Sequence, residues 1–190
     1  MDLDTRPPEM ERSTMMVWIQ QCPNCGHCAK DVSHFAPELR GTLESPNYRQ
    51  HLANKALPPL AAEFICAGLL QEAAGSLVEA GWEYLHAAWI ADDAGLLSGS
   101  KQWRDETARC WRRAMDSTDL HPKLCADLDT IMVDCLRRAG RGQEALPIID
   151  RLLSGESNSV IEKVLVFQRE LITHEDFGRH TVSESIKQED

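Results

Sequence analysis

The stretch LAAEFICAGLLQEAAGSLVEAGWEYLHAAWIADDAG, residues 60–95, decides the fold of this chain. In its first half, apolar residues recur at spacings of three and four: Leu60, Phe64, Ala67 and Leu70. This is the period of a helix that buries one face. Gly75 ends the first pattern, and a second pattern of the same period lasts until Gly95. The stretch therefore predicts two helices, 60–74 and 76–95, that pack as an antiparallel hairpin.

The same periodicity continues toward the C-terminus. Apolar and small residues at helical spacing predict a helix over residues 101–117 and a second that begins at 119 or 121 and ends at 139. Two more follow over residues 143–153 and 159–172. The chain is therefore expected to be mainly α, with about six helices.

Two of the predicted hairpins share one spacing of small and apolar residues. Gly68, Gly75, Ala80, Tyr84 and Ala87 have the same intervals as a second set 65 residues further on: Val133, Gly140, Ala145, Ile149 and Leu152. A small residue lets two helix backbones approach, a turn glycine ends the first helix, and the larger residue fills the groove of its neighbour. The spacing resembles a tetratricopeptide repeat. It favours antiparallel hairpins of tetratricopeptide-like type, with a generic helical bundle as the alternative.

Residues 22–28, Cys-Pro-Asn-Cys-Gly-His-Cys, are the second informative stretch. Two cysteines separated by two residues can bind one zinc ion, because a turn of this kind directs backbone amides at both sulfurs. Pro23 and Gly26 suit so tight a turn. The short apolar run at residues 15–19 predicts the strand that enters it, as part of a small N-terminal β-hairpin.

A closed zinc site needs four ligands. Cys28 is the nearest third ligand, and the fold would have to bring the fourth from His27, His34, His51 or Cys66. The candidate metal ligands are therefore Cys22, Cys25, Cys28 and His34, around a structural zinc ion. The alternatives are free thiols in a vestigial turn, or iron–sulfur ligation by the three cysteines.

Composition divides the chain into four segments. Residues 1–14 are polar with two prolines and no periodicity, which predicts a mobile N-terminal segment. Residues 15–59 hold the cysteine knuckle and a connection rich in loops. Residues 60–174 form the helical domain, and residues 175–190 are expected to be a polar C-terminal tail that frays.

This order of features resembles an uncharacterised bacterial family of unknown function, in which ribbon knuckles precede tetratricopeptide-like helices. The resemblance covers most of residues 18–153, and its specific residues are Cys22, Pro23, Cys25 and Gly26. It implies a knuckle of zinc-ribbon type at these four positions. This chain lacks the upstream cysteine pair of that family, and the family has no established activity, so the resemblance implies no reaction.

Charge and composition exclude several classes of function. A net charge of −10 argues against nucleic acid as the main partner, because phosphate binding requires an excess of clustered Lys and Arg. No apolar stretch approaches the ~20 residues of a membrane-spanning helix, and the N-terminus does not have the pattern of a signal peptide. Seven cysteines, an odd number, favour reduced thiols over a disulfide framework. We therefore expect a cytoplasmic protein with no membrane or nucleic-acid partner.

The charge is spread unevenly. Lys55 is the only basic residue between positions 54 and 100, where there are six acidic ones. Residues 101–141 hold nine basic and seven acidic side chains. These segments are either ordinary solvated helix faces or complementary surfaces used in self-association.

Few polar residues suggest catalysis. Glu83 and His86 lie one helical turn apart, which is the spacing of di-iron carboxylate bundles, but such sites need a second pair of this kind. The alternative is that both lie on a solvated face. We expect a non-catalytic helical scaffold that binds a protein or peptide, including a second copy of itself. The alternative function is a metalloprotein with redox or metal-dependent chemistry at residues 22–28 or at Glu83 and His86.

Overall fold

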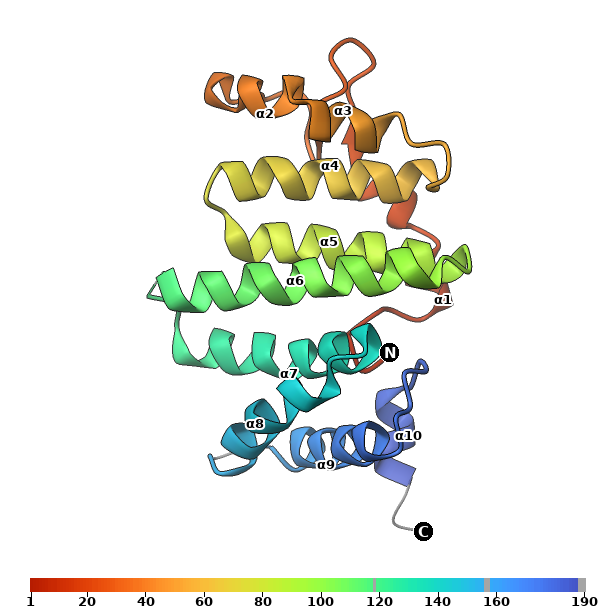
Figure 1. Cartoon of the computed structure of the whole chain (residues 1–190), viewed down its shortest axis with the longest axis vertical. Helices are drawn as coiled ribbons and strands as arrows, with labels where there is room; N and C mark the ends of the chain where they lie inside the picture. Colours follow the sequence, from red (N-terminus) through yellow and green to blue (C-terminus); the bar gives the residue numbers. More distant parts are fainter. Residues whose placement is uncertain (118, 156–157, 188–190) are drawn as a thin grey trace. The chain divides into compact units, whose positions relative to one another are not determined.

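The computed structural model describes residues 1–117, 119–155 and 158–187. The chain forms two compact units. The first, Ser13–Ala114, is called the knuckle unit; the second, which joins Met1–Arg12 to Met115–Asp190, is called the terminal unit because it holds both chain ends. The fold is mainly α with a small two-stranded antiparallel sheet, which confirms the predicted fold class (Figure 1).

The knuckle unit begins with short elements and continues with long helices. The short elements are the 3-10 helices η1 (Met15–Val17) and η2 (Pro37–Leu39), the strands β1 (Gln20–Gln21) and β2 (Cys28–Ala29), and the helices α2 (Arg40–Glu44) and α3 (Pro46–Leu52). The long helices are α4 (Pro59–Ala73), α5 (Leu77–Asp93) and most of α6 (Leu97–Ser117). All three long helices were predicted, with ends that differ by a few residues.

Helices α4 and α5 form the predicted antiparallel hairpin (Figure 1). They approach closely at Gly68, where an added Cβ atom would lie 2.7 Å from Cε1 of Tyr84. Gly75, at the turn, has a φ of +79°, a left-handed conformation that glycine adopts without steric cost. Ala80 and Ala87 are fully buried. The small and large residues of the repeated spacing thus have the packing roles predicted for them.

Helix α6 packs on α5 through a second glycine. A Cβ atom at Gly81 would lie 2.9 Å from Cε2 of Trp111 and would overlap Nε1 of the same ring. That indole nitrogen donates a hydrogen bond to the carbonyl oxygen of Val78, 3.0 Å away. The hydroxyl of Thr107 donates to the carbonyl oxygen of Gly81 at 3.1 Å. The absence of a side chain at position 81 therefore lets a large ring lie against the backbone of α5.

An acidic residue on α4 also joins α4 to α6. Nη1 and Nη2 of Arg109 donate to the two carboxylate oxygens of Glu72, each at 2.8 Å, and Arg113 forms a further ion pair with the same group. The hydrogen bonds from Arg109 lower the pKa of Glu72 to about 2. The carboxylate therefore stays ionised well below its ordinary range, which keeps the link between the two helices charged.

The segment before the cysteine run differs from its prediction. We predicted a strand over residues 15–19, but Met15–Val17 is a 3-10 helix and the strand begins at Gln20. Met15 and Ile19 are buried, whereas Met16 and Val17 are each 70% exposed. A strand would bury alternate residues, whereas a spacing of four suits a helical turn. The prediction of a strand was therefore wrong, because only the two end residues of the apolar run are buried in the core.

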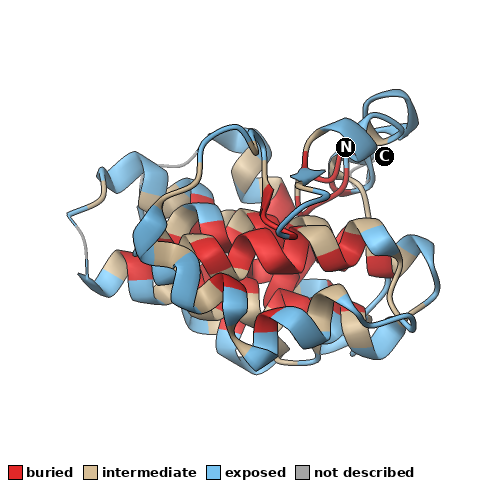
Figure 2. Ribbon diagram, turned by 90° about the horizontal axis from the view of Figure 1, so that it is seen from above, coloured by how far each residue is buried: buried red, intermediate tan, exposed pale blue. Residues whose placement is uncertain are grey.

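Most of the buried hydrophobic residues lie on the long helices, and many loop residues are exposed, but the N-terminal loop that holds Leu3 and Asp4 is buried (Figure 2). In the knuckle unit, the buried positions of α5 occur on several sides of the helix and not on one stripe. This agrees with a helix that packs against α4 as well as α6. Many of these positions are small, among them Ala80, Gly81, Ala87, Ala88 and Ala91.

The terminal unit contains the last turn of α6 and five further helices within the residues described. These are α1 (Glu9–Arg12), α7 (Pro122–Ala139), α8 (Gly142–Leu153), α9 (Ser159–Thr173) and α10 (Val182–Lys187). Helices α7, α8 and α9 match the predicted ones. Gly140, with a φ of +85°, ends α7 as the repeated spacing predicted.

Residues near the two chain ends pair with one another in the terminal unit, where we had predicted a mobile segment 1–14 and a polar tail 175–190 that frays. Residues 188–190 of that predicted tail lie outside the described residues. Asp2 forms an isolated antiparallel bridge with Thr181, and the Leu3 amide donates to the carbonyl oxygen of His180 at 3.0 Å. Leu3 packs in an apolar cluster with residues of α9 and α10: Val164, Phe167, Leu171 and Val182. Single apolar residues in polar segments show no periodicity, so the sequence did not reveal this pairing.

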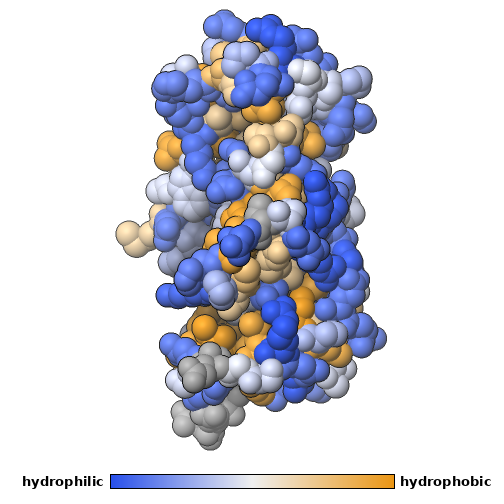
Figure 3. Space-filling model, turned by 90° about the vertical axis from the view of Figure 1, so that its left-hand side faces the viewer, coloured by the Kyte–Doolittle hydropathy of each residue, from blue (hydrophilic) through white to orange (hydrophobic). Residues whose placement is uncertain are grey.

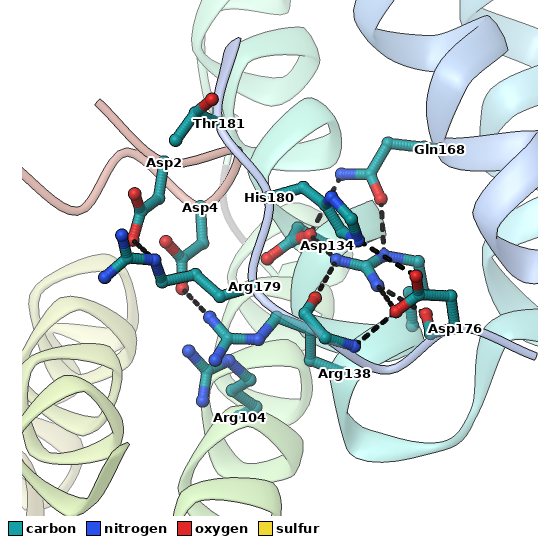
Figure 4. Close-up of polar contacts among 12 residues, drawn as sticks. Asp2, Asp4, Arg104, Asp134, Arg138, Gln168, Asp176, Arg179, His180 and Thr181 are labelled. Atoms are coloured by element: carbon teal, nitrogen blue, oxygen red, sulfur yellow. Dashed lines mark hydrogen bonds and ion pairs between the residues drawn. The ribbon is translucent and has the colours of Figure 1, made fainter. Parts of the chain in front are cut away.

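A buried arginine on α7, Arg137, fastens the segment between α9 and α10. Figure 4 labels two of the residues that it binds, Asp134 and Gln168. Nη2 of Arg137 donates to Oδ1 of Asp134 at 2.6 Å and to the carbonyl oxygen of Gly178 at 2.9 Å. Its Nε donates to Oε1 of Gln168 on α9 at 2.8 Å. The side chain of Arg137 is 1% exposed. One guanidinium thus joins α7, α9 and the loop at residues 174–181.

No helix among residues 1–117, 119–155 and 158–187 has both the length and the apolar content to cross a membrane. On the face drawn in Figure 3, hydrophobic side chains form patches that hydrophilic ones interrupt. The large exposed hydrophobic residues are likewise scattered along the sequence, from Met1 to Ile186.

Replacement of Gly81 by alanine is expected to lower the free energy of unfolding by about 1–3 kcal/mol, because the new methyl group overlaps the Trp111 ring. Gly99→Ala in α6 is the control, since a Cβ atom there would lie 3.9 Å from its nearest neighbours. Urea unfolding compares the two variants. A Gly81→Ala protein as stable as the Gly99→Ala protein would contradict the close packing of α5 on α6.

Glu72 is expected to make stability depend on pH in the acid range. Because its pKa is lowered to about 2 from an ordinary value near 4.5, its ion pairs stabilise the fold above about pH 4.5. This stabilisation is lost as the pH falls from about 4.5 to about 2. Glu72→Gln should reduce the loss of unfolding free energy over this interval by on the order of 1–3 kcal/mol. Glu79→Gln removes the same charge at an exposed position of α5 and is the matched control.

Arg137→Met is expected to destabilise the chain by about 3–5 kcal/mol, because it leaves the Asp134 carboxylate buried without this guanidinium. Arg141→Met is the matched control, since the side chains of the Arg141–Glu144 pair are 36% and 44% exposed and the pair should contribute less than about 1 kcal/mol. Limited proteolysis should also cut the loop at residues 174–181 faster in Arg137→Met. Equal stability of the two variants would refute this role for Arg137.

Candidate metal site at the cysteine turn

The cysteine run forms the loop between β1 and β2, called the cysteine turn (residues 22–28). The amide of Cys22 donates to the carbonyl oxygen of His27 at 2.8 Å, and the amide of Gly26 donates to the carbonyl oxygen of Cys22 at 2.9 Å. Gly26 has a φ of +80°, which favours glycine at this position. The strand pairing of Gln21 with Cys28 closes the loop. The run therefore forms the tight turn that its sequence predicts.

The turn brings Cys22 and Cys25 together. The pKa of the Cys22 thiol is lowered, first by hydrogen bonds from the backbone amides of Cys25 and Asn24 and then by one from the Cys25 thiol. Cys25 is exposed and Cys22 is half-buried. Amides directed at the sulfur favour the thiolate, which is the form that binds zinc. The turn therefore brings these two thiols within hydrogen-bonding distance of each other.

Helix α3 supports the turn from inside the fold. The hydroxyl of Tyr48 donates to the carbonyl oxygen of Gly26 at 2.8 Å and accepts from the amide of Cys28 at 3.1 Å. Arg49 donates to the carbonyl oxygen of Cys25 at 2.9 Å. A Cβ atom at Gly26 would lie 2.8 Å from Cδ2 of Leu52, so the turn backbone rests directly on this helix. Contacts from Tyr48, Arg49 and Leu52 of α3 thereby hold the backbone of the turn in place.

Cys28 points into the fold. It is 1% exposed, and its sulfur lies 3.5 Å from the carbonyl oxygen of Gly26. Its thiol also forms a hydrogen bond with the buried thiol of Cys66 on α4. This hydrogen bond, together with burial, raises the pKa of Cys66. Cys66 in turn lies 3.7 Å from the carbonyl oxygen of Tyr48. Cys28 and Cys66 therefore form a buried thiol pair between the turn and α4.

The histidines proposed as the fourth ligand lie in different surroundings. His34 is 88% exposed in its side chain, with Nδ1 2.8 Å from Oγ of Ser33 and 3.3 Å from Oδ2 of Asp31. His27 packs edge-on against Phe35, and burial lowers its pKa. His51 packs edge-on against Trp103, and burial lowers its pKa also. Each of these three imidazole rings therefore contacts a different set of neighbouring residues.

The predicted set of Cys22, Cys25, Cys28 and His34 is consequently not gathered at one point. Within the described ranges, no group of three or more Cys, His, Asp or Glu side chains is placed to hold a metal ion. We had predicted Cys28 as a ligand together with Cys22 and Cys25 because the three cysteines are close along the chain. The strand pairing reverses the chain at the turn, so the Cys28 side chain enters the core instead.

The Glu83–His86 pair is part of an aromatic cluster and does not lie on a solvated face. The Glu83 side chain is 2% exposed, with one oxygen 3.3 Å from Nδ1 of His86 and the other 3.5 Å from Nζ of Lys30. Four aromatic rings surround the imidazole, with centroids 5.1–6.2 Å away: Trp18, Phe64, Trp82 and Trp89. Trp18, before the cysteine turn, and Lys30, after it, thus both contact α5.

Sequence reasoning missed the residues that support the site. Tyr48 lies in a segment expected to be loop-rich, yet Ser45 caps α3 by accepting a hydrogen bond from the Tyr48 amide at 3.2 Å. Ser45-Pro46 is a helix start signal, a cap followed by proline at the first helical position, and it could have revealed this helix. Trp82, His86 and Trp89 share one face of α5 at spacings of four and three, which was a signal for the cluster.

Comparisons with family models, with curated proteins and with solved structures find no match for this chain. The resemblance carried by Cys22, Pro23, Cys25 and Gly26 stays a prediction. Any functional proposal accordingly rests on the geometry of the cysteine turn and of the helices that support it.

Proposed function

We propose that this chain is a non-catalytic helical scaffold that binds a protein or peptide, with a structural zinc knuckle at Cys22 and Cys25. The observation that carries the proposal is the pair of cysteines held at an exposed turn by Tyr48 and Arg49. A metal bound there would join the turn to whatever supplies its remaining ligands. It would therefore serve to fasten polypeptide segments together.

The helices support a structural role. Two of their close contacts are glycine-to-aromatic packing, Gly68 against Tyr84 and Gly81 against Trp111. The polar groups that could suggest chemistry are engaged in holding segments together: Glu83 pairs with Lys30 and His86, while His86 contacts four aromatic rings. This use of Glu83 and His86 favours the scaffold over the alternative of metal-dependent chemistry at that pair.

Zinc analysis of the purified protein tests the knuckle. We expect zinc in the wild-type protein and at least a tenfold loss of zinc in both Cys22→Ser and Cys25→Ser, because each removes one of two paired thiolates. Cys125→Ser, on α7, is the control and should retain zinc. Circular dichroism should show unchanged helix content in all three variants.

Three results would count against the proposal. Zinc that survives both Cys22→Ser and Cys25→Ser would place the metal elsewhere. Iron bound in place of zinc, retained in those variants and lost in His86→Ala, would support the alternative of metal-dependent chemistry at Glu83 and His86. For the scaffold itself, sedimentation at rising protein concentration should reveal association, and a strict monomer that yields no crosslinks would oppose it.

A further inference from the structure

The cysteine turn presents two thiols outward and keeps the third inward. Cys25 and its neighbours Pro23 and Asn24 are exposed, whereas Cys28 is buried against Cys66. Within the part of the chain that the structure describes, no third Cys, His, Asp or Glu joins the pair. A structural zinc ion takes four ligands, so Cys22 and Cys25 supply half of a coordination shell.

The turn is also too firmly held to collect ligands by bending. Tyr48 and Arg49 each bind one carbonyl oxygen of the turn, and Leu52 fills the space beneath Gly26. Recruitment of Cys28 would require its sulfur to leave Cys66, and the bond from its amide to Tyr48 fixes the backbone at that point. The open side of the site is therefore the exposed side, where another chain can approach.

We propose that a second copy of this chain supplies the other half, so that one zinc ion is bound by Cys22 and Cys25 of two chains. This inference rests on the zinc knuckle of the proposed function. A tetrahedral shell has a twofold axis that exchanges one pair of ligands with the other. Two identical cysteine turns related by that axis therefore complete the site, as in the isologous contacts of most homodimers.

Charge near the turn suits this arrangement. Four thiolates around one divalent ion leave a net negative charge, which costs free energy unless nearby positive groups offset it. The Arg49 guanidinium donates to the carbonyl oxygen of Cys25, next to the pair. Two chains would bring two such guanidiniums to the one metal.

Metal stoichiometry and mass, measured together on the full chain under a non-chelating reductant, test the inference. Native mass spectrometry should show a dimer with one zinc ion for two chains. Removal of zinc by a chelator should weaken dimerisation at least tenfold, and added zinc should restore it. Titration of the metal-free protein with Co²⁺ should saturate at about half an equivalent per chain, with the absorption typical of four thiolates.

Variants separate this inference from the proposed function. Cys25→Ser should give a monomer without zinc, whereas Cys125→Ser should behave as wild type. One zinc ion in each monomeric chain would overturn the shared site and leave the zinc knuckle standing. A wild-type protein that binds no zinc would overturn both.

Two other outcomes also overturn the shared site. They are a dimer that persists after zinc is removed and a zinc ion shared with a different protein. If Cys25→Ser loses its helical circular dichroism, the chelator and Co²⁺ titrations of the wild-type protein still decide the question.

Discussion

The close approach of α4 and α6 to α5 is the constraint on which the knuckle unit depends. Where Gly68 and Gly81 have no side chain, the rings of Tyr84 and Trp111 lie against the neighbouring backbone. Close-packed interiors tolerate little change in volume, so these two contacts set the distances between all three helices. Helix α5 also carries Glu83 and His86, which hold Lys30 and Trp18 of the segment around the cysteine turn. The position of that segment therefore follows from the packing of α5.

The cysteine turn shows how one run of sequence can be divided between two environments. Strand pairing and the bonds to Tyr48 leave Cys22 and Cys25 at the surface but send Cys28 inward to Cys66. The amides of the turn favour the thiolate at Cys22, while burial and the bond to Cys28 favour the neutral thiol at Cys66. The two pairs of thiols consequently differ in chemistry. The outer pair lies at an accessible turn, and the inner pair behaves as part of the core.

Much of the helical structure could be predicted because its signals are local. Apolar periodicity predicted helices α4 to α9. Gly75, Gly95 and Gly140 were predicted to end helices, and each has a positive φ at the turn that follows its helix. The prediction of a strand at residues 15–19 was wrong because the apolar run is too short to distinguish periods of two and four. The pairing of the two chain ends through Leu3 and Val182 escaped prediction as well, since it depends on contacts between residues far apart in the sequence.

The sequence by itself determined the helical class, the hairpin spacing and the turn that joins Cys22 to Cys25, because each depends on residues within a few positions of one another. Only the tertiary structure decided which side chains share an environment. It placed Cys28 with Cys66, enclosed His86 in aromatic rings, left His34 exposed, and joined Arg137 to the loop that contains Gly178. The physical reason is that burial and coordination depend on several segments meeting in space. Spacing along one segment does not carry that information.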